Sequence, residues 1–387
     1  MHVSKSHGLN AERLAHLKAV IEDDIEKDLY FGGAMIVARH GEIGFHEAFG
    51  HADSKKAIPV KKDSVFSLFS VTKSFTNVLV LRAIEMGQLA FHAKIKDVVP
   101  QFAGKGRDDI NVLHLLTHSS GMPPIYTPNE GMYIDVLEDM VTAICERVAA
   151  EHKPNEVCAY SALVSHAMLG YMLVKTDPKG RRFRDIANED LLFPLGLKDT
   201  SVGRRRDLKE RHLVPEFRNN NSPTQHLGHS NFGPNGAFEE EDAEMPWVGI
   251  VSTALDMYRF AEMLRQGGSG NGVRILSPRM VEMARRNYTG DKPNEVYKKL
   301  CLDRGWPVIP AYIGLGFPLR GEAIGVNLYG TMTSPATMGG YGAGTTIWWV
   351  DPERDLTFVG LMTGVMNADA NYLRWRRLSD IAVSAAT

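Results

Sequence analysis

Both ends of the chain carry the same local pattern, a helix beside a pair of strands, and this pattern most restricts the fold. The first pair follows a helix that begins at Asn10, and its strands turn at His40-Gly41 as a hairpin. The last pair precedes a final helix. The four expected strands are residues 33–39, 42–49, 345–350 and 356–362. We therefore expect the two ends to build one antiparallel sheet flanked by helices, an α+β fold.

The middle of the chain predicts mainly helices, because its apolar residues recur at three- and four-residue steps. This divides the chain into a sheet domain, residues 9–69 and 248–387, and a mainly helical domain, residues 70–247. Residues 200–247 lack periodicity and contain the runs Arg204–Arg206, Asn219–Asn221 and Glu239–Glu241. That loop-rich segment fits a cover over a site and a solvated linker equally well.

Composition excludes several classes of protein. The 387 residues carry a formal net charge of −2, so no basic surface for nucleic acid or an anionic membrane is expected. No apolar run is long enough to span a membrane, and the first residues lack the apolar core of a signal peptide. The three cysteines, Cys145, Cys158 and Cys301, are odd in number and far apart, so we expect reduced thiols rather than a disulfide framework. We expect a cytoplasmic protein with a small-molecule partner and no metal or cofactor; homo-oligomer formation stays open.

One short motif carries a candidate nucleophile. Ser70-Val71-Thr72-Lys73 is the only S-x-x-K in the chain, and the apolar pattern that follows predicts a helix from about Ser70 to Gly87. Residues three apart share a helix face, so Ser70 and Lys73 point the same way. The lysine amine can take the serine proton, or lower the pKa of a third group that does. The same four residues also fit an ordinary helix start.

Two further elements supply candidate partners. Tyr160-Ser161-Ala162 opens a predicted helix, and a nearby ammonium would favour the tyrosine phenolate as a proton acceptor. The glycine-rich run 337–344 enters the strand at Thr345 and leaves backbone N–H groups uncovered. One of them, with that of Ser70, would form an oxyanion hole. A half-buried tyrosine and a simple glycine turn explain the same patterns.

Together the three elements resemble serine β-lactamases and penicillin-binding proteins. The order is S-x-x-K at a helix start, Tyr-Ser 90 positions later, and a glycine-rich motif entering a late strand. The surroundings are similar to the esterase branch, the family VIII carboxylesterases, and to the class C β-lactamase-like group. The segments that carry this similarity are residues 114–123, 193–200, 249–254 and 349–352. The resemblance covers about residues 10 to 385.

The resemblance implies roles for particular residues. Ser70 would be the acylated nucleophile, Lys73 its electrostatic and proton-relay partner, and Tyr160 the general base and then the acid. The backbone N–H of Tyr341 would complete the oxyanion hole with that of Ser70. The implied fold places this site in the cleft between the sheet domain and the helical domain.

The departures from the β-lactamase pattern favour an esterase. Met338-Gly339-Gly340-Tyr341 stands where β-lactamases have Lys-Thr-Gly-Ser, and Ala162 replaces the asparagine of Tyr-x-Asn. A substrate carboxylate would lose a charge-assisted hydrogen bond worth roughly 1.5–3 kcal/mol, whereas an uncharged ester loses nothing. We expect small or medium carboxylic esters as substrates. The expected contacts, which also fit a protein core, are Phe69, Ala162, Met338, Gly339 and Gly340.

Other functions share the same residues. An acyltransferase would pass the acyl group of Ser70 to an alcohol or amine instead of water, with an acceptor site in residues 200–247. An amide, β-lactam or D-peptide hydrolase is a weaker alternative because of Met338 and Ala162. A penicillin-sensor-like binding module is the non-enzyme alternative. No G-x-S-x-G is present, and we expect His118 to be structural.

Overall fold

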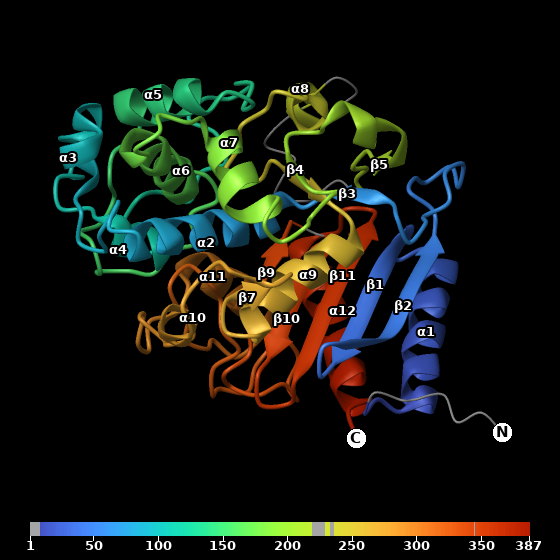
Figure 1. Ribbon diagram of the computed structural model, residues 1–387. Helices are drawn as coiled ribbons and strands as arrows, with labels where there is room; N and C mark the ends of the chain where they lie inside the picture. The colour runs from blue at the N-terminus through green and yellow to red at the C-terminus, as the bar shows by residue number, and fades with distance from the viewer. Residues whose placement is uncertain (1–7, 219–228, 233–235, 344) are drawn as a thin grey trace.

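The centre of the protein is a five-stranded antiparallel sheet, shown in Figure 1. The computed structural model describes residues 8–218, 229–232, 236–343 and 345–387. The strand order is β2-β1-β11-β10-β9, so strands from the start of the chain pair with strands from its end. The strands are β1 (Gly32–Arg39), β2 (Glu42–Gly50), β9 (Met338–Gly342), β10 (Thr346–Asp351) and β11 (Leu356–Thr363). The predicted sheet of both chain ends, and with it the α+β fold class, is confirmed.

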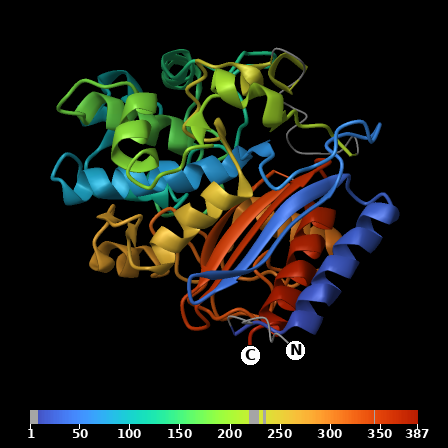
Figure 2. The same ribbon diagram turned by 45° about the vertical axis from the view of Figure 1, so that its right-hand side comes forward.

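Helices cover both faces of this sheet. The two terminal helices, α1 (Ala11–Glu26) and α12 (Ala368–Ser384), lie side by side on one face (Figure 2). The helix α9 (Ala254–Arg265) packs on the other face. Successive residues of a strand point to opposite faces, so Trp349 packs with the terminal helices and Trp348 packs against α9. The strands β1, β9, β10 and β11 are therefore buried almost throughout, whereas the edge strand β2 is partly exposed.

Short local signals explain where several of these elements begin and turn. The Asn10 side chain accepts the N–H of Arg13 and caps α1, as predicted. His40 and Gly41 both have positive φ, 55° and 78°, which suits the tight hairpin between β1 and β2. Thr253 caps α9 by accepting the N–H of Asp256.

The helical layer is built around α2 (Thr72–Glu85), which is buried along most of its length. It packs on the sheet at one end and against α6 (Val164–Thr176) along its side. The other α-helices of this layer are α3 (Ile95–Val98), α4 (Val112–Leu116), α5 (Leu137–Arg147), α7 (Phe183–Ala187) and α8 (His229–Phe232). We propose to keep the boundaries 9–69 with 248–387 and 70–247 for the two domains.

The loop-rich segment 200–247 is only partly described. Its runs of charge pair with each other: Arg204 lies 3.4 Å from Glu239, and Arg206 lies 3.3 Å from Glu241. It also supplies the strands β4 (Ser201–Val202) and β5 (His212–Leu213), which join a small sheet with β3 (Val65–Ser67) and β6 (Ile250–Ser252). The Asn219–Asn221 run of the predicted loop-rich segment lies outside the described residues, as do the other residues of 219–228 and 233–235.

Three elements differ from the expectation or add to it. The glycine-rich run, predicted as a turn into a strand, contains the edge strand β9, although its Gly344 lies outside the described residues. Between β8 (Val273–Arg274) and β9 the chain adds the helices α10 (Pro278–Ala284) and α11 (Glu295–Arg304).

Among the described residues, no helix combines the length and the apolar character that a membrane span requires.

Candidate active site

The backbone presents Ser70 from a strained turn. A 3₁₀ turn, Phe69–Val71, joins β3 to α2, and Phe69 adopts a positive φ of 51°. For a bulky residue this conformation costs about 1–3 kcal/mol and persists only where the surroundings impose it. Here Leu68 is held on both sides: its N–H donates to the carbonyl of Ile250, and its carbonyl accepts the Thr346 hydroxyl at 2.8 Å. The turn before the serine is therefore fixed by two strands.

Lys73 contacts Ser70 from the next turn of the helix. Its Nζ lies 3.1 Å from Ser70 Oγ and 2.9 Å from the carbonyl oxygen of Trp247. The side chain is 5% exposed, and burial lowers the pKa of Lys73 well below its usual value. A larger share of this lysine is thus the neutral amine, which is a proton acceptor.

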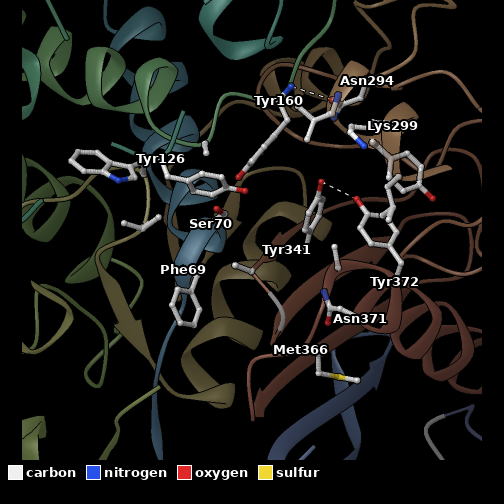
Figure 3. A pocket seen from close by; sticks show the side chains of 18 of the residues that line it. Phe69, Ser70, Tyr126, Tyr160, Asn294, Lys299, Tyr341, Met366, Asn371 and Tyr372 are labelled. Carbon is white, nitrogen blue, oxygen red and sulfur yellow. Dashed lines mark hydrogen bonds between the residues drawn. The ribbon is translucent and has the colours of Figure 1, made fainter. Parts of the chain in front are cut away.

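Tyr160 reaches the same serine from the loop before α6. Its N–H donates to Asn294 Oδ1 at 3.1 Å, and in Figure 3 its side chain points from Asn294 toward Ser70. Lys73 Nζ lies 5.2 Å from the centre of its ring. Burial and the nearby Tyr341 raise the pKa of Tyr160 well above its usual value, while a hydrogen bond with Ser70 lowers it.

Burial affects the pKa values of both Lys73 and Tyr160. A lysine ammonium was expected to favour the Tyr160 phenolate. Burial lowers the pKa of Lys73 and raises the pKa of Tyr160, so it disfavours the charged form of each group. Burial is a tertiary property, so the S-x-x-K and Tyr-Ser patterns do not reveal it.

His118 packs against the ring of Tyr160. Its Nδ1 accepts the backbone N–H of Ser161 at 3.1 Å, and its ring packs on that of Tyr160 with centres 5.0 Å apart. Burial lowers the pKa of His118 to about 3, so the ring is neutral at neutral pH. These contacts support the structural role expected for it.

Glycines let the edge strand β9 approach the serine turn. A Cβ on Gly342 would lie 2.4 Å from the Leu68 carbonyl oxygen, and one on Gly340 would lie 2.5 Å from Ser74 Oγ. Neither position has room for a side chain. The glycines therefore set the distance between β9 and the start of α2.

The strand register shows which N–H groups face this edge. Gly339 donates to the carbonyl of Pro318, on the side away from β10, so the N–H of Tyr341 two residues later points the same way. The carbonyl of Gly342 accepts the Thr345 N–H on the β10 side. In a trans peptide the carbonyl and the N–H of the next residue point in opposite directions, so the Ala343 N–H also points away from β10. Gly342 lies against Leu68 and Phe69, so the next residue, Ala343, lies beside the turn that carries Ser70. Ala343 and Ser70 line the same cavity.

A cavity of about 320 Å³ opens in front of these groups. Its walls are mostly aromatic and aliphatic, with a polar end formed by α11 and α12. The lining residues are Phe69, Ser70, Tyr126, Tyr160, Ala162, Phe238, Trp247, Val248, Asn294, Val296, Tyr297, Lys299, Leu300, Asp303, Tyr341, Ala343, Met366, Ala368, Asn371 and Tyr372. A site of this shape suits a small organic substrate with few polar groups.

The predicted substrate contacts divide into two groups. Phe69 and Ala162 line the cavity. Met338, Gly339 and Gly340 do not: the Met338 side chain is fully buried on the other face of β9, where its sulfur lies 3.3 Å from Arg285 Nε. Two-residue alternation along a strand puts Met338 and the lining residue Tyr341 on opposite faces.

The sequence analysis missed several residues of the site. Asn294 caps α11 and also holds the Tyr160 backbone, and α11 supplies one wall of the cavity. Tyr372 of α12 donates to the Tyr341 hydroxyl at 3.2 Å (Figure 3). An asparagine before a helical run is a capping signal, but nothing local in the sequence indicates that this helix covers a cavity.

Comparison with known proteins gives a consistent result. A family model described as Beta-lactamase matches residues 17–382. Esterase EstB of Burkholderia gladioli is 37% identical over 308 residues, which cover 72% of this chain and 76% of EstB. Penicillin-binding protein 4* of Bacillus subtilis (strain 168) is 29% identical over 201 residues, 51% of this chain, and the chain spans only 43% of that protein.

Solved structures agree on the fold. EstCE1, a hydrolase with promiscuous acyltransferase activity, superposes with a TM-score of 0.77 and 20% identity, covering 96% of this chain and 99% of its own. At this identity the likeness shows the fold alone.

Proposed function

The chain belongs to the beta-lactamase family of serine hydrolases, and from that premise we propose that it is a carboxylesterase that forms an acyl-enzyme on Ser70. The observation that carries this proposal is the contact of Ser70 Oγ with Lys73 Nζ at 3.1 Å, at the wall of a largely apolar cavity. A serine hydroxyl needs such a partner to become a nucleophile. The esterase EstB among its relatives supports the same activity.

Acylation begins with Ser70 Oγ attacking the ester carbonyl carbon. The neutral Lys73 amine takes the serine proton, and Tyr160 gives its proton to the leaving alkoxide. This order differs from the expectation that Tyr160 acts first as the base, because burial favours the amine and the phenol. The step leaves acyl-Ser70, a Lys73 ammonium and a Tyr160 phenolate.

Hydrolysis reverses these transfers. The Tyr160 phenolate takes a proton from water, whose oxygen bonds to the acyl carbon. The bond to Ser70 Oγ then breaks, and Ser70 recovers its proton from Lys73. Both groups return to their neutral forms, and the carboxylic acid leaves.

The oxyanion of each tetrahedral intermediate needs two N–H donors. We assign one to Ser70, at the start of a helical turn where N–H groups have no helical partner. We assign the other to Ala343 rather than to the expected Tyr341, since Ala343 follows the glycine that abuts the serine turn. In this register, Gly340-Tyr341-Gly342-Ala343 corresponds to the Lys-Thr-Gly-Ser motif of β-lactamases, with Gly340 at the position of the lysine.

That register strengthens the preference for uncharged esters. Gly340, in the place of the lysine, has no side chain, and Ser74 and the Trp348 indole fill the space beside it. Lys299, a cation among the described lining residues, is paired with Asp303 at 2.8 Å. Among the described residues that line the cavity, a substrate carboxylate therefore has no dedicated partner beside Ser70.

A burst experiment tests the esterase. p-Nitrophenyl acetate and butyrate are mixed with wild type and Ser70→Ala, and intact mass is measured before and after. We expect a gain of one acyl group and steady turnover in wild type, both absent in Ser70→Ala. Ser165→Ala is a suitable control, because it removes another buried serine hydroxyl from the helical layer. Equal turnover by wild type and Ser70→Ala would disprove the assignment.

Acyl transfer is the second candidate. The cavity continues past Ser70 to Asn371, Lys299 and Asp303, so an acceptor can lie beside the acyl group. Adding an alcohol during turnover and measuring ester product against free acid decides between transfer and hydrolysis.

A further inference from the structure

Tyr160 lies on irregular backbone just before α6, where hydrogen bonds from other parts of the chain must fix its position. The Ala159 N–H donates to the carbonyl oxygen of His118 at 2.9 Å, and the Ser161 N–H donates to Nδ1 of the same histidine at 3.1 Å. Between them, the Tyr160 N–H donates to Asn294 Oδ1 at 3.1 Å. His118 therefore holds the residues on both sides of Tyr160.

The backbone of His118 is itself held in place. It has a φ of 53°, a conformation that persists in a residue with a side chain only where the surroundings impose it. The turn that follows is tied to the loop before Tyr160 a second time, because the Asn155 N–H donates to the Ser119 carbonyl at 2.7 Å and the Ser119 hydroxyl donates to Asn155 Oδ1 at 3.0 Å. His118 thus holds this loop from a fixed position.

The ring of His118 contributes a hydrogen-bond acceptor. Because Nδ1 accepts the Ser161 N–H, the neutral ring carries its proton on Nε2. Burial and the nearby Lys73 lower the pKa of His118 to about 3, so Nδ1 stays unprotonated at neutral pH. The ring also packs against that of Tyr160, with centres 5.0 Å apart.

We propose that His118 is a positioning residue for proton transfer by Tyr160. This inference rests on the proposed esterase function. Among the described residues, those that line the main cavity do not include His118, so it acts through Tyr160. In acylation, the bond between the acyl carbon and the leaving oxygen breaks, and that oxygen takes the Tyr160 proton. The two acceptors and the ring of His118 hold Tyr160 where this transfer occurs.

Two butyrate esters that differ only in the leaving group test this role. Ethoxide is a strong base and leaves only when it gains a proton, whereas p-nitrophenolate is a weak base and leaves without one. His118→Leu keeps apolar bulk and removes the acceptor. We expect it to lower kcat/KM for ethyl butyrate at least about tenfold more than kcat/KM for p-nitrophenyl butyrate, part of the roughly 10²–10⁴ that a positioned acid contributes. Loss of folded enzyme lowers both values alike and cancels in their ratio. An unchanged ratio would overturn the proposal.

His118→Asn and His114→Ala are the matched variants. The asparagine carbonyl oxygen is bonded to Cγ, as Nδ1 is, and asparagine tolerates positive φ. His118→Asn should therefore keep the ratio within about threefold of wild type. His114→Ala removes another imidazole from the same segment, one that caps α4 and contacts Asn155, so it should lower the melting temperature and leave the ratio unchanged. A ratio as low in His118→Asn as in His118→Leu would contradict the acceptor role.

Nitrogen NMR of wild type with isotope-labelled histidine tests the hydrogen bond without any activity measurement. The His118 signals, identified by their loss in His118→Asn, should show a proton on Nε2 and none on Nδ1 at neutral pH. A proton on Nδ1 would overturn the proposal, even where His118→Leu fails to fold. Absence of ester cleavage and of acyl-Ser70 in wild type would instead refute the esterase.

Discussion

Lys73 Nζ donates to the carbonyl oxygen of Trp247 at 2.9 Å, a contact that joins the helix carrying Ser70 to the end of the loop-rich segment. Trp247 is also a wall of the main cavity. The same contact holds the amine at hydrogen-bond distance from Ser70. Residues 200–247, which the sequence leaves open as a cover or a linker, therefore include a direct neighbour of the proposed catalytic lysine.

The lowered pKa of Lys73 should be visible in the pH dependence of kcat/KM. Because burial lowers its pKa, we expect kcat/KM for p-nitrophenyl butyrate to fall as pH drops through that lowered value, where the amine gains a proton. The midpoint should lie well below the usual lysine pKa of about 10.4. Lys73→Met should lose about 10²–10⁴ in acylation rate. An acid limb that persists in the residual activity of Lys73→Met would assign it to another group.

The glycines of β9 allow a test of the oxyanion hole. In Gly342→Ala the new methyl would meet the Leu68 carbonyl oxygen at 2.4 Å and the Phe69 Cβ at 3.0 Å, so the strand and the serine turn must separate. We expect kcat to fall about 10²–10³-fold, the usual effect of losing one oxyanion donor.

Gly180→Ala is the matched control for this substitution. Gly180 has a φ of +64° in open space, so alanine there strains the backbone far from the site. It should lower the melting temperature and leave kcat unchanged. If Gly342→Ala retains kcat within about threefold, an effect below 1 kcal/mol, the Ala343 assignment is wrong.

Much of the fold follows from local signals in the sequence. The Asn10 cap, the His40-Gly41 hairpin and the one-turn spacing of Ser70 and Lys73 each depend on a few neighbouring residues. The pairing of the two chain ends follows because four strands with apolar faces need one another. The meeting of Tyr160 with Ser70 came only from the resemblance, since 90 positions separate them.

What the sequence did not predict depends on tertiary contacts. β9 contains three glycines in five residues, a composition poor in strand formers, and it becomes a strand because β10 pairs with it. The wall made by α11 depends on Asn294 reaching Tyr160, more than 100 positions away in the chain. The lowered pKa of Lys73 and the raised pKa of Tyr160 arise from burial, which residue spacing does not encode.

Acid should destabilise the protein through buried histidines, and His212 isolates the effect. Its Nε2 lies 2.9 Å from Ser67 Oγ, and burial lowers the pKa of His212 to about 3. Below pH 6.5 the unfolded chain gains a proton that the folded chain refuses, so stability falls as pH drops toward 3.

This effect is measurable by urea unfolding. Between pH 7.5 and 5, wild type should lose on the order of 2 kcal/mol more than His212→Gln. His16→Gln, at an exposed histidine of α1, controls for the loss of an imidazole. Parallel pH dependence of wild type and His212→Gln would mean that His212 titrates normally in the folded protein.

Substrate charge should separate this enzyme from the β-lactamases of its family. With Gly340 in the place of the cation, and Ser74 and Trp348 filling the space beside it, a carboxylate next to the reacting carbonyl gains no ion pair. Loss of a charge-assisted hydrogen bond of roughly 1.5–3 kcal/mol corresponds to a factor of about 10–160 in kcat/KM. Because the carboxylate would lose hydration in the largely apolar cavity without gaining an ion pair, we expect p-nitrophenyl monosuccinate to be cleaved at least about tenfold less efficiently than p-nitrophenyl butyrate. Its methyl ester, which removes the charge and keeps the chain, should recover most of the difference. Equal kcat/KM for the acid and its methyl ester would show that another cation, with Lys299 the first candidate, binds the carboxylate.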